Sequence, residues 1–138
     1  MRVAFDIPCV PVPQSRPRFT RQGHAYDTQK SKAYKALVRA EAANRMRGRK
    51  PFDGAVVASL KFYLPIPKSW SKKKREAALD RRILPIGRVG DTDNYVKAVL
   101  DACNGVIYDD DSQVIHITAE KWYGDVAGVV AEFTCFSK

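Results

Sequence analysis

Two clusters of aspartates with a lysine between them have residue types and spacing that could support metal-dependent chemistry. The first cluster is Asp91 and Asp93, the second is Asp109–Asp111, and the lysine is Lys97. Carboxylates brought together in space repel one another, and a hard divalent cation can hold them. Mg²⁺ prefers oxygen ligands and typically binds one or two carboxylates directly while keeping several waters. The pattern therefore predicts a magnesium site.

A helix is expected between the two clusters. The apolar residues Val96, Val99, Leu100 and Cys103 recur at helical spacing, and Gly105 ends the pattern. Asp91 and Asp93 fall at the helix N-terminus, where the dipole and free N–H groups favour anions. Asp93 and Lys97 are four residues apart and project from one flank of this helix.

The second cluster is expected to return to the first. The apolar run 106–108 is followed by a predicted turn at 109–112 and a strand from Val114. Because a helix and the strand that follows it usually pack together, this arrangement would bring Asp109–Asp111 close to Asp91 and Asp93.

Simpler interpretations exist for each part of the pattern. Asp91 or Asp93 could be an ordinary helix N-cap, Asp109–Asp111 could be a solvated turn, and Lys97 could be a surface partner of Asp93. The coincidence of all three in a basic chain favours the metal site.

The composition points to a globular protein that binds a polyanion. The chain of 138 residues is 45% hydrophobic and 28% charged, and its net charge is +9 despite the acidic clusters. No basic amphipathic helix suggests a membrane surface, no apolar run approaches the length of a membrane span, and the N-terminus lacks a signal peptide pattern. We expect a soluble, cytoplasmic protein without an organic cofactor.

Three cysteines, Cys9, Cys103 and Cys135, are far apart and flanked by apolar residues. They form no zinc-binding spacing, so we expect buried free thiols in a reducing compartment.

Two segments concentrate positive charge. In the proline-rich segment Pro11–Gly23, Arg16, Arg18 and Arg21 accompany Phe19, which suits contacts with DNA phosphates or, alternatively, a solvated basic loop. The run Lys72–Arg75 follows Trp70 and a predicted N-cap at Ser71, and it could bind the DNA backbone or be a solvated helix face.

The remaining chain alternates between strand and helix patterns. Strands are predicted at 3–10, 55–64, 112–123 and 128–136, a helix at 28–47 and a short helix after Ser71. The turn at Gly124 and Asp125 predicts that the last two strands form a hairpin.

The motifs resemble those of the RusA family of Holliday-junction resolvases, common in phages and prophages. The pattern D-x-D-N-x-x-K is present as Asp91–Lys97, and D-D-x-Q-V is present as Asp110–Val114. The proline-rich segment with its arginines, Gly23 and Tyr26 also resembles the family's DNA-contacting loop.

The resemblance implies a single α+β domain over residues 1–138, with a mixed β-sheet packed against two or three helices. It implies a homodimer that binds four-way DNA junctions and nicks two strands symmetrically with Mg²⁺ or Mn²⁺. The catalytic residues would be Asp91, Asp93, Asp111 and Lys97, with the three aspartates as metal ligands and Asp110 as a secondary acid. The DNA-binding residues would be Gln14, Ser15, Arg16, Arg18, Arg21 and Arg88.

One departure from the family concerns the segment before Asp91. Some members have a run of arginines there, whereas this chain reads Gly87-Arg88-Val89-Gly90. Junction contacts would then depend more on the Arg16–Arg21 loop and on Lys72–Arg75.

Two other functions fit the same residues. A non-catalytic nucleic-acid-binding module would use the basic surface and treat the aspartates as caps and turns. A metal-dependent nuclease for other branched or single-stranded DNA would share the site but not the substrate. A Ser-His-Asp or Cys-His centre is not indicated, because neither His24 nor His116 lies in such a pattern.

Overall fold

A mixed four-stranded sheet forms the centre of the fold, in the order β1-β6-β4-β5. The computed structural model describes residues 1–14, 18–23, 25–26, 28–87 and 90–136. The sheet strands are β1 (Arg2–Ile7), β4 (Ala55–Pro65), β5 (Val114–Gly124) and β6 (Gly128–Phe136). β6 pairs antiparallel with both β1 and β4, whereas β5 pairs parallel with β4 at one edge.

The predicted hairpin between the last two strands is wrong. β4 lies between β5 and β6 and pairs with both of them. Neighbouring strands are about 4.8 Å apart, so the short connection after Gly124 is long enough to step across one intervening strand. A Cβ atom at Gly124 would lie 2.8 Å from the Cβ of Tyr63, because the chain crosses closely over β4 here. A short turn between two strand patterns does not distinguish these arrangements.

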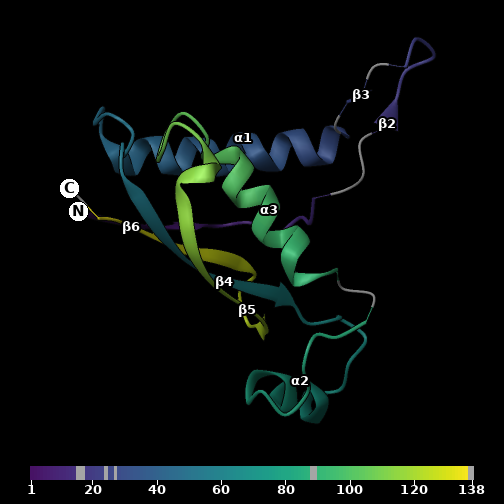
Figure 1. Cartoon of the computed structure of the whole chain (residues 1–138). Helices are drawn as coiled ribbons and strands as arrows, with labels where there is room; N and C mark the ends of the chain where they lie inside the picture. The colour runs from purple at the N-terminus through teal and green to yellow at the C-terminus, as the bar shows by residue number, and fades with distance from the viewer. Residues whose placement is uncertain (15–17, 24, 27, 88–89, 137–138) are drawn as a thin grey trace.

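Two helices pack on one face of the sheet (Figure 1). α1 (Gln29–Met46) begins at the N-cap Thr28, whose side chain accepts a hydrogen bond from the Ser31 N–H, and α1 contacts β1. α3 (Thr92–Ala102) contacts both α1 and β5. The predicted helices at these positions are confirmed, and with α2 (Lys72–Leu79) they give the expected α+β arrangement.

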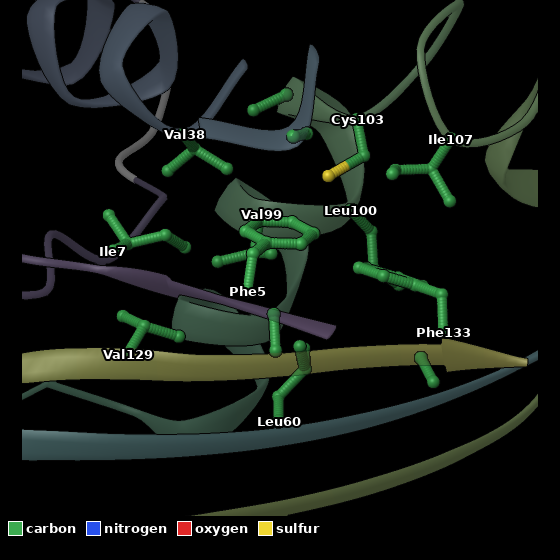
Figure 2. Close-up of a cluster of buried hydrophobic side chains, with 14 of the residues drawn as sticks. Phe5, Ile7, Val38, Leu60, Val99, Leu100, Cys103, Ile107, Val129 and Phe133 are labelled. Carbon is green, nitrogen blue, oxygen red and sulfur yellow. The ribbon is translucent and has the colours of Figure 1, made fainter. Parts of the chain in front are cut away.

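The core lies between these helices and the sheet, as Figure 2 shows. Val38 of α1, Val99 of α3 and Leu60 of β4 are each fully buried. Cys103 and Cys135 are also buried, Cys9 is half-buried, and all three cysteines are free thiols as expected. This shared core fixes α3 relative to the sheet.

Two smaller elements lie outside the layers. β2 (Arg18–Phe19) and β3 (Ala25–Tyr26) pair as a short hairpin that projects beyond the N-terminus of α1, and α2 lies beyond the end of β4 on the other side of the molecule (Figure 1). Within the part of the chain that the structure describes, no helix is both long and apolar enough to cross a membrane.

Candidate metal-dependent active site

A groove between α3 and β5 collects most of the residues that the sequence singled out. Its volume is about 570 Å³. Its polar lining consists of Thr92, Asp93, Lys97 and Asp111, and its apolar lining consists of Val96, Leu100, Ile117 and Ala119. The two aspartate clusters therefore meet at this groove through one member each, Asp93 and Asp111.

The N-terminus of α3 supplies the first carboxylates. Asp91 occupies the N-cap position, but its side chain makes no capping hydrogen bond. Asp93 lies in the first turn, where its Oδ1 accepts a hydrogen bond of 3.0 Å from the Asn94 N–H. Both side chains are exposed. Asp91 is therefore the N-cap residue that the simpler interpretation predicts, although its side chain does not cap the helix.

Lys97 lies one turn after Asp93 and lines the same groove. In the described part of the chain, its ammonium group forms no ion pair, so it is not the surface partner of Asp93. An exposed ammonium group beside two carboxylates can approach an anionic ligand in the groove.

The second acidic cluster divides into structural and groove-lining members. Asp110 is the N-cap of the short 3₁₀ helix η1 (Asp111–Gln113), and its Oδ2 accepts a hydrogen bond from the Ser112 N–H at 3.0 Å. The hydrogen bonds from Ser112 lower the pKa of Asp110 below its ordinary value. Asp110 therefore stabilises the turn, whereas the half-buried Asp111 reaches the groove.

Gln113 holds this turn in place, a role that was not predicted from the sequence. Its Oε1 accepts the N–H groups of Asp109 and Asp110 at 2.9 and 3.1 Å. Its Nε2 donates to the carbonyls of Phe52 and Gly54 at 2.7 and 3.0 Å. Both donors and both acceptor positions of the amide are used. The Gln of the D-x-Q pattern was the available signal for this role.

A second residue without an assigned role is Lys121 of β5. Its Nζ donates to the Gly90 carbonyl at 2.7 Å and so ties β5 to the residue just before Asp91. No pattern in the sequence indicated this contact, because the two residues are distant in the chain.

The carboxylates suit a metal that takes few protein ligands. Among the described residues, no three His, Cys, Asp or Glu side chains gather closely enough to form a complete ligand set. Mg²⁺ commonly binds one or two carboxylates and keeps its other waters, and Asp93 and Asp111 on one groove provide such a pair. Asp91 lies two residues from Asp93 but does not line the groove.

The predicted DNA-binding residues fall in three places. The backbone N–H of Gln14 donates to the Asn94 carbonyl at 2.8 Å, so the base of the proline-rich segment is attached beside Asp93. Arg21 is exposed in the turn between β2 and β3, and Arg18 belongs to β2. Ser15, Arg16 and Arg88 lie outside the described residues.

His116 does not extend the site. It is exposed on β5, where its Nε2 lies 3.4 Å from the Thr118 hydroxyl. His24 is outside the described residues. The groove instead combines two carboxylates with a lysine, in a chain whose net positive charge attracts anions. Hydrolases that cleave phosphodiesters with a divalent metal can use such groups.

Comparison with known proteins gives the class. The chain matches the endodeoxyribonuclease RusA family over residues 8–133, and it belongs to this family. It is also 41% identical to the uncharacterized protein YqaN of Bacillus subtilis (strain 168), over an alignment of 128 residues that covers 89% of each chain.

Proposed function

We propose that this protein is a Holliday-junction resolvase that nicks two strands symmetrically and depends on Mg²⁺ or Mn²⁺. The main support is that Asp93, Lys97 and Asp111 line one groove in a chain of the RusA endodeoxyribonuclease family. We further propose that it acts as a cytoplasmic homodimer in DNA recombination and repair.

The proposed chemistry is hydrolysis of a phosphodiester. Asp93 and Asp111, with Asp91 beside them, would hold the metal, which would supply an activated water and stabilise developing negative charge. Lys97 would place its ammonium group against the phosphoryl oxygens as they gain charge in the transition state. The carboxylates would also orient the attacking water.

DNA binding must overcome the negative charge of the site itself. The net charge of +9 supports attraction of DNA through its phosphates. We propose that the β2–β3 hairpin contacts DNA through Arg21 and Arg18, because the segment that leads into it is attached at Asn94, next to the groove. A junction has approximate two-fold symmetry, and paired nicking calls for two sites in a two-fold dimer.

Asp111→Asn is expected to abolish cleavage and retain binding. The substitution removes one negative charge from the groove, so affinity for DNA should stay the same or rise. A labelled four-way junction, incubated with Mg²⁺, Mn²⁺ or EDTA beside a matched linear duplex, measures cleavage. Anisotropy in EDTA measures binding.

The matched control is Asp109→Asn. It removes the same charge two residues before Asp111, from a side chain that does not line the groove. It should cleave like the unmodified protein. Cleavage by Asp111→Asn at the unmodified rate would refute the site. Metal-independent binding without nicks would indicate a non-catalytic module, and nicking of flaps or single strands in preference to junctions would indicate a different nuclease.

A further inference from the structure

A basic segment between β4 and α3 is not used by the proposed chemistry. This segment, the basic insert, comprises residues 66–87 and contains α2. It carries seven Lys and Arg and two Asp and Glu, so it contributes a net charge of +5 to the chain's +9. Its most concentrated part is the run Lys72–Arg75, at the start of α2.

The position of this run is unfavourable for the helix itself. Acidic side chains stabilise a helix N-terminus and cations destabilise it, by about 0.3–1 kcal/mol each at the surface. The first turn of α2 has no acidic residue, and Ser71 caps it by accepting the Lys74 N–H at 3.2 Å. The charges of the run and of the helix dipole therefore add together. Helix stability does not explain these lysines, whereas attraction of an anion does.

Aromatic contacts fix the basic insert to the end of β5. Trp70 packs edge-on against Tyr123 with ring centroids 5.3 Å apart, and the Lys74 Nζ lies 4.0 Å from the Trp70 ring centroid. Arg81 stacks on Trp122, with its Cζ 3.9 Å from the ring centroid. Because Tyr123 and Trp122 point to opposite faces of the sheet, the insert holds this edge strand from both sides.

The attachment places the run in line with the groove. Ile117 and Ala119 line the groove from β5, and Lys121 and Tyr123 follow on the same face of this strand. At about 3.3 Å per residue, Tyr123 lies about 13 Å beyond Ala119. Each strand of B-DNA advances about 3.4 Å per nucleotide, so this distance corresponds to about four nucleotides.

Lys72 and Lys73 are available for a ligand. Both side chains are exposed, and within the described residues neither takes part in a hydrogen bond, an ion pair or a cation–π contact. Lys74 and Arg75 have partners within the insert: the Trp70 ring and the Pro67 carbonyl.

We propose that the basic insert binds the DNA backbone about four nucleotides from the phosphate in the groove, with Lys72 and Lys73 as its principal phosphate contacts. The proposal rests on the proposed function, since it takes the groove as the place of cleavage. It assigns to α2 a role in affinity for a duplex arm of the junction and no role in the chemical step.

The test compares Lys72→Gln/Lys73→Gln with Arg45→Gln/Lys50→Gln. The control pair removes the same charge from exposed residues near the end of α1, at the opposite side of the molecule from α2 (Figure 1). Junction affinity is measured by anisotropy in EDTA across a salt series, and cleavage is measured in a single turnover with enzyme in excess.

Loss of two phosphate contacts should make the slope of log Kobs against log salt shallower by about 2 and weaken binding by up to about a hundredfold near 0.1 M salt. The control pair should change the slope much less, and the single-turnover rate at saturating enzyme should be unchanged in both variants. An equal slope change in the two pairs would overturn the proposal, and so would an unchanged slope in the insert variant. Absence of metal-dependent cleavage in the unmodified protein would refute the proposed function instead, while the salt slopes would still report on binding by the insert. Tight binding to anionic lipid vesicles that the insert variant loses, with DNA binding unchanged, would assign the surface to membranes.

Discussion

Lys97 and Asp93 show how residue spacing becomes a site. A helix repeats every 3.6 residues, so side chains four apart lie on one face, and both line the groove. Their neighbours Val96, Val99 and Leu100 are buried against the core, which sets the rotation of α3 and turns the polar flank toward β5. Lys97 is free of acidic partners among the described residues, so its charge is available to a bound phosphate.

Lys97→Ala is expected to slow cleavage far more than it weakens binding. Loss of one charge that stabilises a transition state typically lowers the rate about a hundredfold or more. Single-turnover cleavage and EDTA anisotropy on the same junction measure the two effects. Lys97→Arg retains the charge and should recover part of the rate. Equal losses of rate and affinity in Lys97→Ala would make Lys97 a simple phosphate contact.

At the scale of elements, the site depends on how η1 is joined to the sheet. η1 has three residues and cannot position Asp111 by itself. The Gln113 amide accepts the N–H groups of Asp109 and Asp110 within this turn and donates to the carbonyls of Phe52 and Gly54, which lead into β4. On the other side, Lys121 ties β5 to the residue before α3. The groove is therefore held at both ends by side chains outside it.

Gln113→Ala is expected to lower both stability and cleavage. Backbone groups that lose their partners cost about 1–3 kcal/mol of unfolding free energy, and Asp111 loses its fixed position. Urea denaturation measures the loss of stability. Single-turnover cleavage, under conditions in which the variant is folded, measures the loss of activity. Raising the Mg²⁺ concentration should recover part of the rate if the defect lies in metal binding.

Gln113→Glu separates the two halves of the amide's role, because it can accept the two N–H groups but cannot donate to Phe52 and Gly54. It should therefore be as defective in cleavage as Gln113→Ala. A folded Gln113→Ala protein with an unchanged rate would remove Gln113 from the site.

At the scale of the whole molecule, the two helices and the sheet bury one continuous core that includes ionisable groups. Burial raises the pKa of Cys103 to about 12, and burial also raises the pKa of Tyr108 above its ordinary value. The Tyr108 hydroxyl donates to the Leu100 carbonyl at 2.6 Å, which joins the segment after α3 to the helix. Both groups are neutral in the folded protein at physiological pH.

Unfolding free energy is expected to fall as pH rises above 9. The Cys103 thiol ionises near 9.0 in the unfolded chain and near 12 in the folded protein. Between these pH values the unfolded state binds fewer protons than the folded state. The contribution of the thiol to the unfolding free energy is therefore fully present below pH 9 and is lost as the pH rises toward 12. The slope for one thiol approaches about 1.4 kcal/mol per pH unit.

Urea denaturation between pH 7 and 10.5 measures this dependence. Cys103→Ala should be less stable at pH 7 because of the cavity it leaves, but its stability should fall less steeply above pH 9. The same slope in both proteins would show that Cys103 does not titrate as inferred.

The sequence by itself determined the local structure and the residue types of the candidate site. Ser71 was identified as an N-cap because a hydroxyl before a helical pattern satisfies a free N–H group, and it accepts the Lys74 N–H. The α3 pattern placed Asp93 and Lys97 together because helical spacing is a local property. The strand positions were also predicted from local patterns.

Only the tertiary structure decided how the strands pair and which side of β5 faces α3. The pairing of β4 with β5 shifts between Val56 and Val57, where Ile115 is the extra residue on β5. Because strand side chains alternate, this bulge turns Ile117 and Ala119 toward the groove, where a regular strand would present His116 and Thr118. Which face of β5 turns toward α3 depends on packing apolar side chains against that helix in the folded protein. No local sequence pattern contains that information.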